Sequence, residues 1–484
     1  MLKTRHQGQS ENAYERWNRA QNFTGFRGLG FSRPGKGFKT LYVFSVNHSA
    51  HGGVKMTEWQ KIDFDAIIIG SGPGGATVAN ELSKSGKRVL ILERGHGKPL
   101  NGTLWQGFTM GMIPGRNLLF TQQLLSVIRG ITVGGSSILY YACAFDPPFE
   151  MFDSYGINIR NEVAELKQEL PIAPLSDNLM GPAANKIMQS AQDLEYGWQK
   201  IPKFVYQDKC RPDCGKCLIG CPHGAKWTAR MYIEETCARG SILLSNARAK
   251  RIITEKGVAK GVTFSIMGRE HQVFSPLIVL AAGGIGTPAL LRSAGIKNAG
   301  YDFFFDPLII VMGSVKDMKA GKEFPMAAGI LDEDEGYVMT DLVWPKLLYW
   351  LFTSQVLRLD RLAAHEHTLP IMIKVKDNLG GYLTRRGGVR KRLSDSDRKK
   401  FKRGYKVAKK ILQNAGARNI YKTWYFAAHP GGTSKINDVV DTNLKTEIDN
   451  LYVCDCSVIP ESWGLPPTLT LLALGKRLVK HLNK

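Results

Sequence analysis

Long apolar runs are missing from this chain of 484 residues, and acidic side chains are scarce. No stretch of about 18 uninterrupted apolar residues occurs, which argues against a transmembrane helix. The first residues lack the compact apolar segment and small-residue cleavage site of a secretory signal. The 51 glycines follow no Gly-X-Y period, so collagen is excluded and Gly-rich turns are expected. We therefore expect a globular cytoplasmic protein, long enough for about three domain-sized units.

The basic excess is concentrated in two segments. The chain has 65 Lys and Arg against 42 Asp and Glu, a net charge of +23. Residues 1–55 contribute +7 and residues 385–410 contribute +11, so the rest is nearly neutral. Such patches attract anionic lipid, nucleic acid or an acidic protein, although a solvated helix face and a disordered tail explain them most simply. Nucleic acid is a poor candidate, because the basic run carries no interleaved aromatic residues and no nucleic-acid-reading motif occurs.

A Gly-rich turn joins an apolar strand, FDAIIIG, to a helix, and a second strand, KRVLILE, follows. Gly70, Gly72 and Gly75, with Gly74 between them, give the spacing G-x-G-x-x-G. The first glycine permits the tight turn, the second lets the backbone approach a diphosphate, and the third allows close helix–strand contact. Glu93 ends the second strand, where a carboxylate accepts hydrogen bonds from ribose hydroxyls. The pattern predicts a dinucleotide site and does not separate FAD from NAD.

Other segments extend the α/β pattern. Residues 241–294 and 448–484 each contain short apolar strands, a glycine- or proline-containing turn and a helix. Residues 300–390 are more irregular and carry aromatic clusters. The stretch from Ser394 to Gly416 predicts a helix, because Ser394 can cap it and Asp395 suits its positive N-terminal end. We expect an α/β fold with a parallel sheet.

Four later segments occur in order: RGITVGGSS (129–137), GGIGTPALLRSAGI (283–296), HPGGT (429–433) and LYVCDCSVIPESWGLPPTLTLLAL (451–474). Together with the dinucleotide motif, they make residues 61–484 resemble the glucose–methanol–choline (GMC) oxidoreductase family of flavoproteins. The resemblance implies a Rossmann-like FAD-binding domain with an α+β substrate domain. It also implies bound FAD and oxidation of a CH–OH group.

The resemblance also implies roles for particular residues. His429 takes the position of the family's catalytic base, and Asp455 lies beside the phosphate–ribitol part of FAD. Pro466 and Tyr140 stand where the family often has a His or Asn, which indicates a more apolar active site. The other residues that the resemblance places at the cofactor are Gly134, Gly135, Ser136, Ser137, Pro467 and Thr468.

Residues 1–55 show no helical or strand period, so we expect residues 1–60 to be a basic, disordered or mis-assigned extension and the natural chain to start at Met56. We expect the following domains in the rest of the chain. The FAD-binding domain comprises 61–150, 225–300 and 425–484; 151–224 is a connecting region with a cysteine cluster, and 301–424 is the substrate domain.

That cluster places four of the eight cysteines within twelve residues: Cys210, Cys214, Cys217 and Cys221, followed by Pro222. The spacing is similar to a ferredoxin ligand run and predicts a [4Fe-4S] cluster. A Zn²⁺ site is the alternative, and a feature of the lineage without metal is a third interpretation. Disulfides are disfavoured in a reducing compartment. An iron–sulfur cluster would favour a dehydrogenase over an oxidase. The four scattered cysteines, Cys143, Cys237, Cys454 and Cys456, are expected to be buried thiols.

The apolar stretch PKLLYWLFTSQVLRLDRL (345–362) is either a core helix, a cover over an apolar pocket or a segment at a bilayer surface. We therefore expect a hydrophobic alcohol as substrate, a quinone or a redox protein as electron acceptor, and peripheral contact with a membrane. Two alternative functions stay open: a flavin and iron–sulfur enzyme acting on a C–C or C=C bond, and a non-catalytic electron carrier.

Overall fold

A six-stranded parallel sheet forms one half of the molecule in the computed structural model, which describes residues 43–44 and 59–484. Its strands lie in the order β1, β9, β3, β2, β13 and β23. The apolar runs of β2 and β3 are buried along their whole length, as expected for strands covered on both faces. The bounds are β1 Val43–Phe44, β2 Ala66–Ile69, β3 Val89–Glu93, β9 Ile242–Ser245, β13 Ile278–Leu280 and β23 Leu451–Val453.

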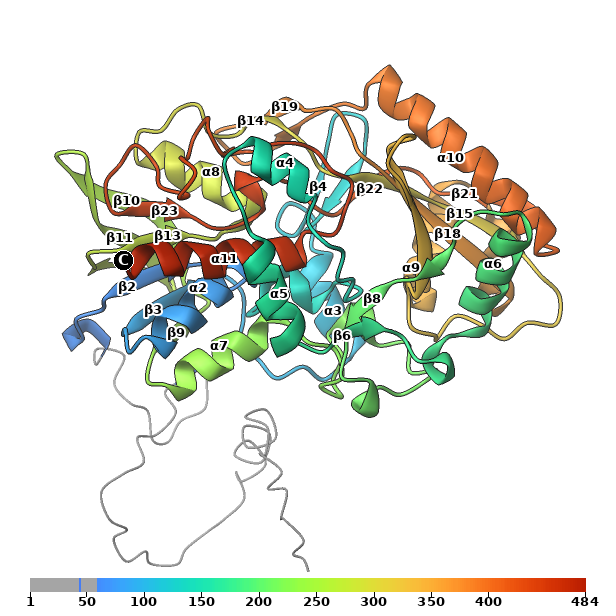
Figure 1. Cartoon of the computed structure of the whole chain (residues 1–484), viewed down its shortest axis with the longest axis horizontal. Helices are drawn as coiled ribbons and strands as arrows, with labels where there is room; N and C mark the ends of the chain where they lie inside the picture. Colours follow the sequence, from blue (N-terminus) through green and yellow to red (C-terminus); the bar gives the residue numbers. More distant parts are fainter. Residues whose placement is uncertain (1–42, 45–58) are drawn as a thin grey trace, which may run out of the picture.

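Helices cover this sheet. Helix α2 (Pro73–Lys84) packs between α7 (Ala229–Ala238) and the C-terminal helix α11 (Thr468–Leu482), although α2 and α11 lie almost 400 residues apart in sequence (Figure 1). An antiparallel meander of β10 (Arg248–Glu255), β11 (Val258–Ile266) and β12 (Arg269–Phe274) contacts β3 and β13. Helix α8 (Gly283–Ser293) packs against β10. The predicted α/β fold is confirmed.

A nine-stranded, mostly antiparallel sheet forms the other half (Figure 1). Eight strands run in the order β4, β5, β22, β15, β18, β17, β16 and β7, and β21 pairs with β15. Their bounds are β4 Leu118–Phe120, β5 Ser126–Ile128, β7 Gln199–Lys200, β15 Pro307–Ser314, β16 Ala328–Asp332, β17 Tyr337–Asp341, β18 Thr368–Val375, β21 Arg418–Lys422 and β22 Phe426–Ala427. This sheet therefore takes strands from all parts of the chain between 118 and 427.

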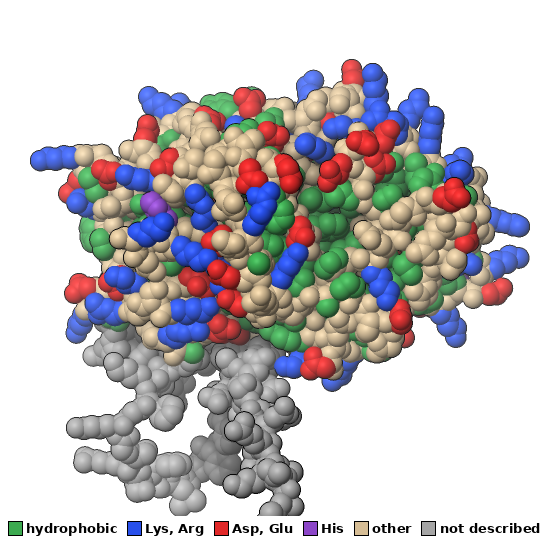
Figure 2. All heavy atoms as spheres, viewed as in Figure 1, with side chains coloured by type: hydrophobic (Ala, Val, Ile, Leu, Met, Phe, Trp, Pro, Cys, Tyr) green, Lys and Arg blue, Asp and Glu red, His purple; other side chains and the backbone are tan. Residues whose placement is uncertain are grey.

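Two helices cover the large sheet. Helix α10 (Asp395–Asn414) packs on β15, β17 and β18, and α6 (Pro182–Asp193) packs on α10. The predicted cap of α10 is confirmed, because the Ser394 hydroxyl accepts from the Asp397 amide while the Asp397 carboxylate accepts from the Ser394 amide. The Lys and Arg residues of the basic run that lie within α10 are on the solvent side of this helix, and Figure 2 shows Lys and Arg side chains along that edge of the molecule.

The remaining elements complete the two halves. Two small sheets consist of β14 (Tyr301–Phe303), β19 (Gly380–Leu383) and β20 (Val389–Arg390), and of β6 (Ile172–Pro174) with β8 (Pro202–Phe204). The other helices are α3 (Leu104–Gly111), α4 (Phe149–Ser154), α5 (Arg160–Glu169) and α9 (Lys346–Gln355).

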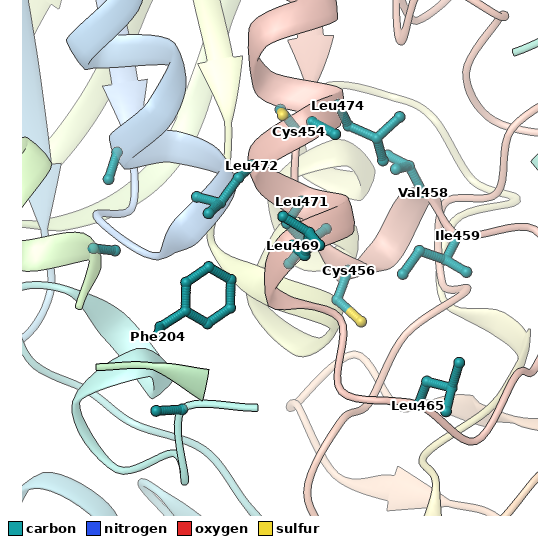
Figure 3. Close-up of a cluster of buried hydrophobic side chains, with 14 of the residues drawn as sticks. Phe204, Cys454, Cys456, Val458, Ile459, Leu465, Leu469, Leu471, Leu472 and Leu474 are labelled. Carbon is teal, nitrogen blue, oxygen red and sulfur yellow. The ribbon is translucent and has the colours of Figure 1, made fainter. Parts of the chain in front are cut away.

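The core continues from one half into the other through the C-terminal segment. Figure 3 shows the leucines of α11 beside Cys454, Cys456 and the residues that precede the helix. Cys143, Cys237, Cys454 and Cys456 are all buried, which confirms their prediction as buried thiols. The predictions of a disordered extension at 1–60 and of a start at Met56 concern residues that lie, apart from 43–44 and 59–60, outside the described part of the chain.

Candidate functional site

The glycines of the β2–α2 turn allow close packing on one side and leave the backbone accessible on the other. Gly70 has a φ of +107°, and a Cβ there would overlap the carbonyl of Ala281. At Gly75 a Cβ would overlap the carbonyl of Gly70, so this glycine permits the close approach of helix to strand, as predicted. At Gly72, by contrast, a Cβ would meet no atom within 4 Å. Gly72 therefore presents bare backbone to an open space at the N-terminus of α2.

Glu93 holds the glycine-rich turn from the end of β3. Its carboxylate accepts hydrogen bonds from the Ser71 amide (3.1 Å), the Ser71 hydroxyl (2.6 Å) and the Gly95 amide (2.6 Å). The Ser71 hydroxyl oxygen accepts in turn from the Gly134 amide at 3.0 Å. Burial raises the pKa of Glu93, and the hydrogen bonds from Ser71 and Gly95 oppose that shift. The carboxylate thus ties the turn to the second predicted loop.

That second loop, Gly134–Ser137, crosses the glycine-rich turn closely. Gly134 and Gly135 have φ of +93° and +58°, and a Cβ on Gly135 would lie 2.9 Å from the Cα of Gly72. The Ser136 hydroxyl accepts from the Gly130 amide, and the Ser137 hydroxyl donates to the Gly134 carbonyl at 2.6 Å. Only glycines allow two loops to cross at this distance.

Asp455 closes the same region from the C-terminal segment. Its carboxylate accepts from the Gly283 amide (2.8 Å), the Thr287 hydroxyl (2.5 Å) and the Ser457 amide (2.8 Å). It therefore joins α8 to the turn after β23. Burial raises the pKa of Asp455, against the effect of these hydrogen bonds.

One cavity of about 870 Å³ lies between these loops and the large sheet. It runs from the glycine-rich turn to His429, so the predicted dinucleotide site and the predicted base share one space. Gly75 and Gly134 are not in its wall and act in packing behind it. The predicted residues that line the cavity are Gly70, Gly72, Gly74, Glu93, Gly135, Ser136, Ser137, His429, Asp455, Pro467 and Thr468.

His429 follows β22 and has its ring anchored at one nitrogen. Its Nδ1 lies 3.3 Å from a carboxylate oxygen of Asp306 and 3.4 Å from the Nζ of Lys374. Asp306 and Lys374 are buried, whereas the His429 side chain is 24% exposed. Burial lowers the pKa of His429, Lys374 lowers it further, and Asp306 opposes the shift. Neither partner could be predicted from the sequence, since neither lies in a recognisable motif.

The two positions that depart from the family pattern also line the cavity. Pro466 offers no donor there. The Tyr140 hydroxyl donates to the carbonyl of Trp227 at 2.7 Å, and burial raises its pKa well above the ordinary value. Neither residue therefore replaces a hydrogen-bonding His or Asn beside His429.

The structure does not support the predicted metal site. Among residues 43–44 and 59–484, no three His, Cys, Asp or Glu side chains are placed to hold a metal ion. Cys217 and Cys221 are buried, and Cys210 and Cys214 are half-buried, each as a free cysteine. Burial, followed by the neighbouring Cys221 and Cys214, raises the pKa of Cys210 to about 12. The spacing matches a ferredoxin run, but the fold of the loop does not bring the thiols into ligand geometry.

A buried lysine holds the cysteine loop instead. The Nζ of Lys226 donates to the carbonyls of Ile138 (2.8 Å), Tyr140 (2.9 Å) and Cys217 (2.6 Å). This links the cysteine loop to the loop over the cavity. Burial lowers the pKa of Lys226 to about 8.

Lys226→Met is expected to lower the free energy of unfolding by about 3 kcal/mol or more, because three buried carbonyls lose their donor. Thermal and urea unfolding would measure the loss. Lys167→Met, which removes a surface ion pair with Asp146, should change stability by less than about 1 kcal/mol. Equal stability of the two variants would show that Lys226 is not the main link between the loops.

Family models and relatives agree with this architecture. Two models, both described as GMC oxidoreductase, match residues 64–309 and 388–475. An uncharacterized protein of Methanocaldococcus jannaschii is 28% identical over 87% of this chain and all of its own length. A long-chain-alcohol oxidase of Arabidopsis thaliana is 22% identical over 91% of this chain and 71% of its own.

Solved structures share the fold. Pyridoxine 4-oxidase from Mesorbium loti superposes with a TM-score of 0.69 at 17% identity, over 87% of this chain and 99% of the other. Formate oxidase gives 0.65 at 15% identity, over 87% and 98%. With the N-terminal family model covering half of the chain and the C-terminal model following it, this protein belongs to the GMC oxidoreductase family and has its two-domain α/β fold.

Proposed function

We propose that this oxidoreductase binds FAD and oxidises the hydroxyl-bearing carbon of an apolar alcohol. One observation carries the proposal: a single cavity joins the dinucleotide loops to a histidine whose Nδ1 faces a buried carboxylate. The relatives support the donor class, since several are long-chain-alcohol oxidases.

The residues around the upper cavity fit FAD. Gly72 leaves room where a side chain would intrude, and the N-terminus of α2 offers amide donors for a diphosphate. Glu93 would bind ribose hydroxyls of FAD. Asp455 and the loop Gly134–Ser137 would bind the rest of the cofactor. When bound, FAD supplies a two-electron acceptor for hydride. One structural neighbour is a formate oxidase variant from Aspergillus oryzae, solved to show the effect of a mutation on FAD modification.

His429 is suited to take the hydroxyl proton. When its Nδ1–H donates to Asp306, the lone pair resides on Nε2 and the ring is held in the basic tautomer. A base with a pKa near neutrality is efficient in this role. Asp306 is thereby a positioning residue, which orients the ring without touching substrate.

The part of the cavity next to the large sheet is mostly apolar, apart from Lys374 and His429. It would exclude water and accept an aliphatic or aromatic chain. Helix α9, from the apolar stretch of the sequence, closes one side of it, so the prediction of a cover over the pocket is part of this proposal. The apolar residues in this part of the wall include Leu308, Met326, Leu342, Trp344, Leu348, Phe352, Met372 and Phe426.

Anaerobic titration with alcohols tests the proposal. Aliphatic alcohols are expected to bleach the bound flavin, and short polar alcohols should do so at higher concentration. The predicted dehydrogenase activity depended on an iron–sulfur cluster, which the described residues do not form. Turnover with quinone, compared with oxygen uptake and peroxide formation, would identify the acceptor. A flavin that no alcohol reduces would contradict the proposed donor.

The pH profile of kcat/KM reports the state of His429. Burial and Lys374 lower its pKa below the usual 6.5, so activity should stay constant at neutral pH and fall only below about 6.5. Asp306 raises that pKa, so Asp306→Asn should move the acid limb to still lower pH. An unchanged or higher limb in the variant would contradict the proposed pairing of Asp306 with His429.

We also infer that the mouth of the cavity lies against the surface of a lipid bilayer. Leu104 and Phe108 of α3, with Leu347 and Leu351 of α9, line the cavity while exposed, and the rings of Trp105 and Trp350 stand beside them. Arg385 and Arg386 line the cavity and are also exposed. Apolar and Trp side chains flanked by cations are typical of interfacial binding. Along the described part of the chain, no helix is long and apolar enough to span a bilayer.

Flotation with vesicles of phosphatidylcholine, with and without phosphatidylglycerol, measures this contact. Phe108→Glu combined with Leu351→Glu should weaken binding by about tenfold or more, because two apolar anchors become charged. Phe274→Glu is the matched control, since Phe274 is exposed on β12, away from the cavity wall. Equal flotation of all three proteins would remove the membrane from the proposal.

A further inference from the structure

Lys374 is a buried cation in the wall of the cavity. It lies on β18 opposite Leu308 of β15, the strand that Asp306 immediately precedes. Its side chain is 1% exposed, and its Nζ lies 3.7 Å from the Asp306 carboxylate and 3.4 Å from His429 Nδ1. Taking a lysine out of water is costly, so a role is expected for it.

Three other buried lysines differ from Lys374 in their partners. Lys226 donates to three carbonyls, and Lys203 donates to two carbonyls and the Cys143 thiol. Lys391 donates to two carbonyls and pairs with Asp377 at 3.1 Å. None of these three lines the cavity.

Lys374 alone among these lysines keeps a donor for a ligand. An ammonium has three N–H groups, and within the described part of the chain Lys374 Nζ has one carboxylate and one ring nitrogen as polar neighbours. When His429 Nδ1–H donates to Asp306, that nitrogen has no lone pair for Lys374. The lysine then retains N–H groups without an acceptor at the edge of the cavity.

We propose that the Lys374 ammonium binds the oxygen of the substrate hydroxyl and stabilises its negative charge while His429 accepts the proton. This inference rests on the proposed function. The hydrogen-bond donor to the substrate oxygen would then lie on β18, because Pro466 has no donor and the Tyr140 hydroxyl already donates to the carbonyl of Trp227. In this proposal the Lys374 ammonium contacts the reacting oxygen, which makes it a catalytic residue.

In the proposed oxidation, the substrate O–H bond breaks and its proton moves to His429 Nε2. A hydrogen on the carbinol carbon leaves with its electron pair as hydride to the flavin, a two-electron oxidant, and a C=O bond forms. Lys374 keeps all its protons and acts through its hydrogen bond and charge.

Burial lowers the pKa of the Lys374 ammonium, and the neighbouring Asp306, Cys143 and Cys456 oppose that shift. His429 Nδ1 lies 3.4 Å from the Lys374 Nζ. Behind Asp306, the Asp377 carboxylate accepts from the backbone amides of Phe305 and Asp306 and pairs with Lys391. The Asp306 carboxylate thus balances the charge of Lys374 from one side, and the substrate oxygen would approach Lys374 from the cavity.

Binding of decanoate and decanamide to the FAD-loaded enzyme tests the inference without turnover. At pH 8, where His429 is neutral, the carboxylate imitates the developing alkoxide and the amide is a neutral control. Calorimetry should show that Lys374→Met lowers the affinity for decanoate roughly tenfold or more and changes the affinity for decanamide by less than about twofold. Lys374→Arg should restore most of the decanoate affinity. Tyr141→Phe, which alters another cavity side chain, should retain it.

Two further measurements keep the inference falsifiable. If Lys374→Met does not fold because Asp306 is left unpaired, Asp306→Asn with Lys374→Met removes both charges, and this double variant should also lose decanoate selectivity. In Lys374→Met the acid limb of kcat/KM should move to higher pH, opposite to Asp306→Asn, since Lys374 lowers the pKa of His429.

The outcomes distinguish failure of the proposed alcohol oxidation from failure of the proposed role of Lys374. Decanoate binding that depends on Lys374, in an enzyme that no alcohol reduces, would overturn the proposed reaction and retain the anion site. Alcohol oxidation with equal decanoate affinity in wild type, Lys374→Met and the double variant would overturn the role of Lys374. A wild-type enzyme that binds decanamide as tightly as decanoate would overturn it as well.

Discussion

His429→Ala is expected to reduce kcat/KM with an aliphatic alcohol by about 10²–10⁴-fold while the protein keeps its FAD. The loss follows from removal of the proton acceptor that Asp306 orients beside the apolar part of the cavity. The ring contributes little to packing, since its side chain is partly exposed to the cavity. Steady-state rates and the flavin absorbance of the same preparation would give both quantities.

A matched variant separates chemistry from folding. His367→Ala removes an exposed imidazole at the end of the 3-10 helix Leu359–His367 and should leave rate and flavin content unchanged. Alcohol oxidation at the wild-type rate by His429→Ala would exclude His429 as the base. Loss of flavin together with activity would indicate that His429 acts in cofactor binding instead.

Gly72→Val should yield a folded protein that retains roughly a tenth of the wild-type FAD or less. A Cβ at Gly72 meets no atom within 4 Å, so the valine side chain should project into the space assigned to the diphosphate without disturbing the fold. Absorbance at flavin wavelengths, normalised to protein, and far-UV circular dichroism would measure the two properties separately.

Two other glycines provide the contrast. Gly197→Val also meets open space, but Gly197 lies outside the cavity wall, so FAD content should be retained. At Gly74 a side chain would overlap the carbonyl of Cys454, so Gly74→Val should fail to fold rather than fold without cofactor. Full FAD occupancy in Gly72→Val would show that the diphosphate does not approach this turn.

Much of the fold could be predicted because its signals are local. The strand, turn and helix around Gly70 are encoded by consecutive residues, and Ser394 caps its helix through the residue three positions on. The cysteine cluster shows the limit of this reasoning. Ligand spacing is local, but ligand geometry depends on the path of the loop, which Lys226 holds from outside the motif.

The sequence by itself determined the parallel sheet, the glycine-rich turn with Glu93 and the family, because each depends on short-range order or on motifs in a fixed succession. Only the tertiary structure decided which charges surround His429. Asp306 and Lys374 precede it by 123 and 55 residues, and pairing of β15 with β18 brings them together. No local pattern records such a contact, because strand register is set by the packing of the whole sheet.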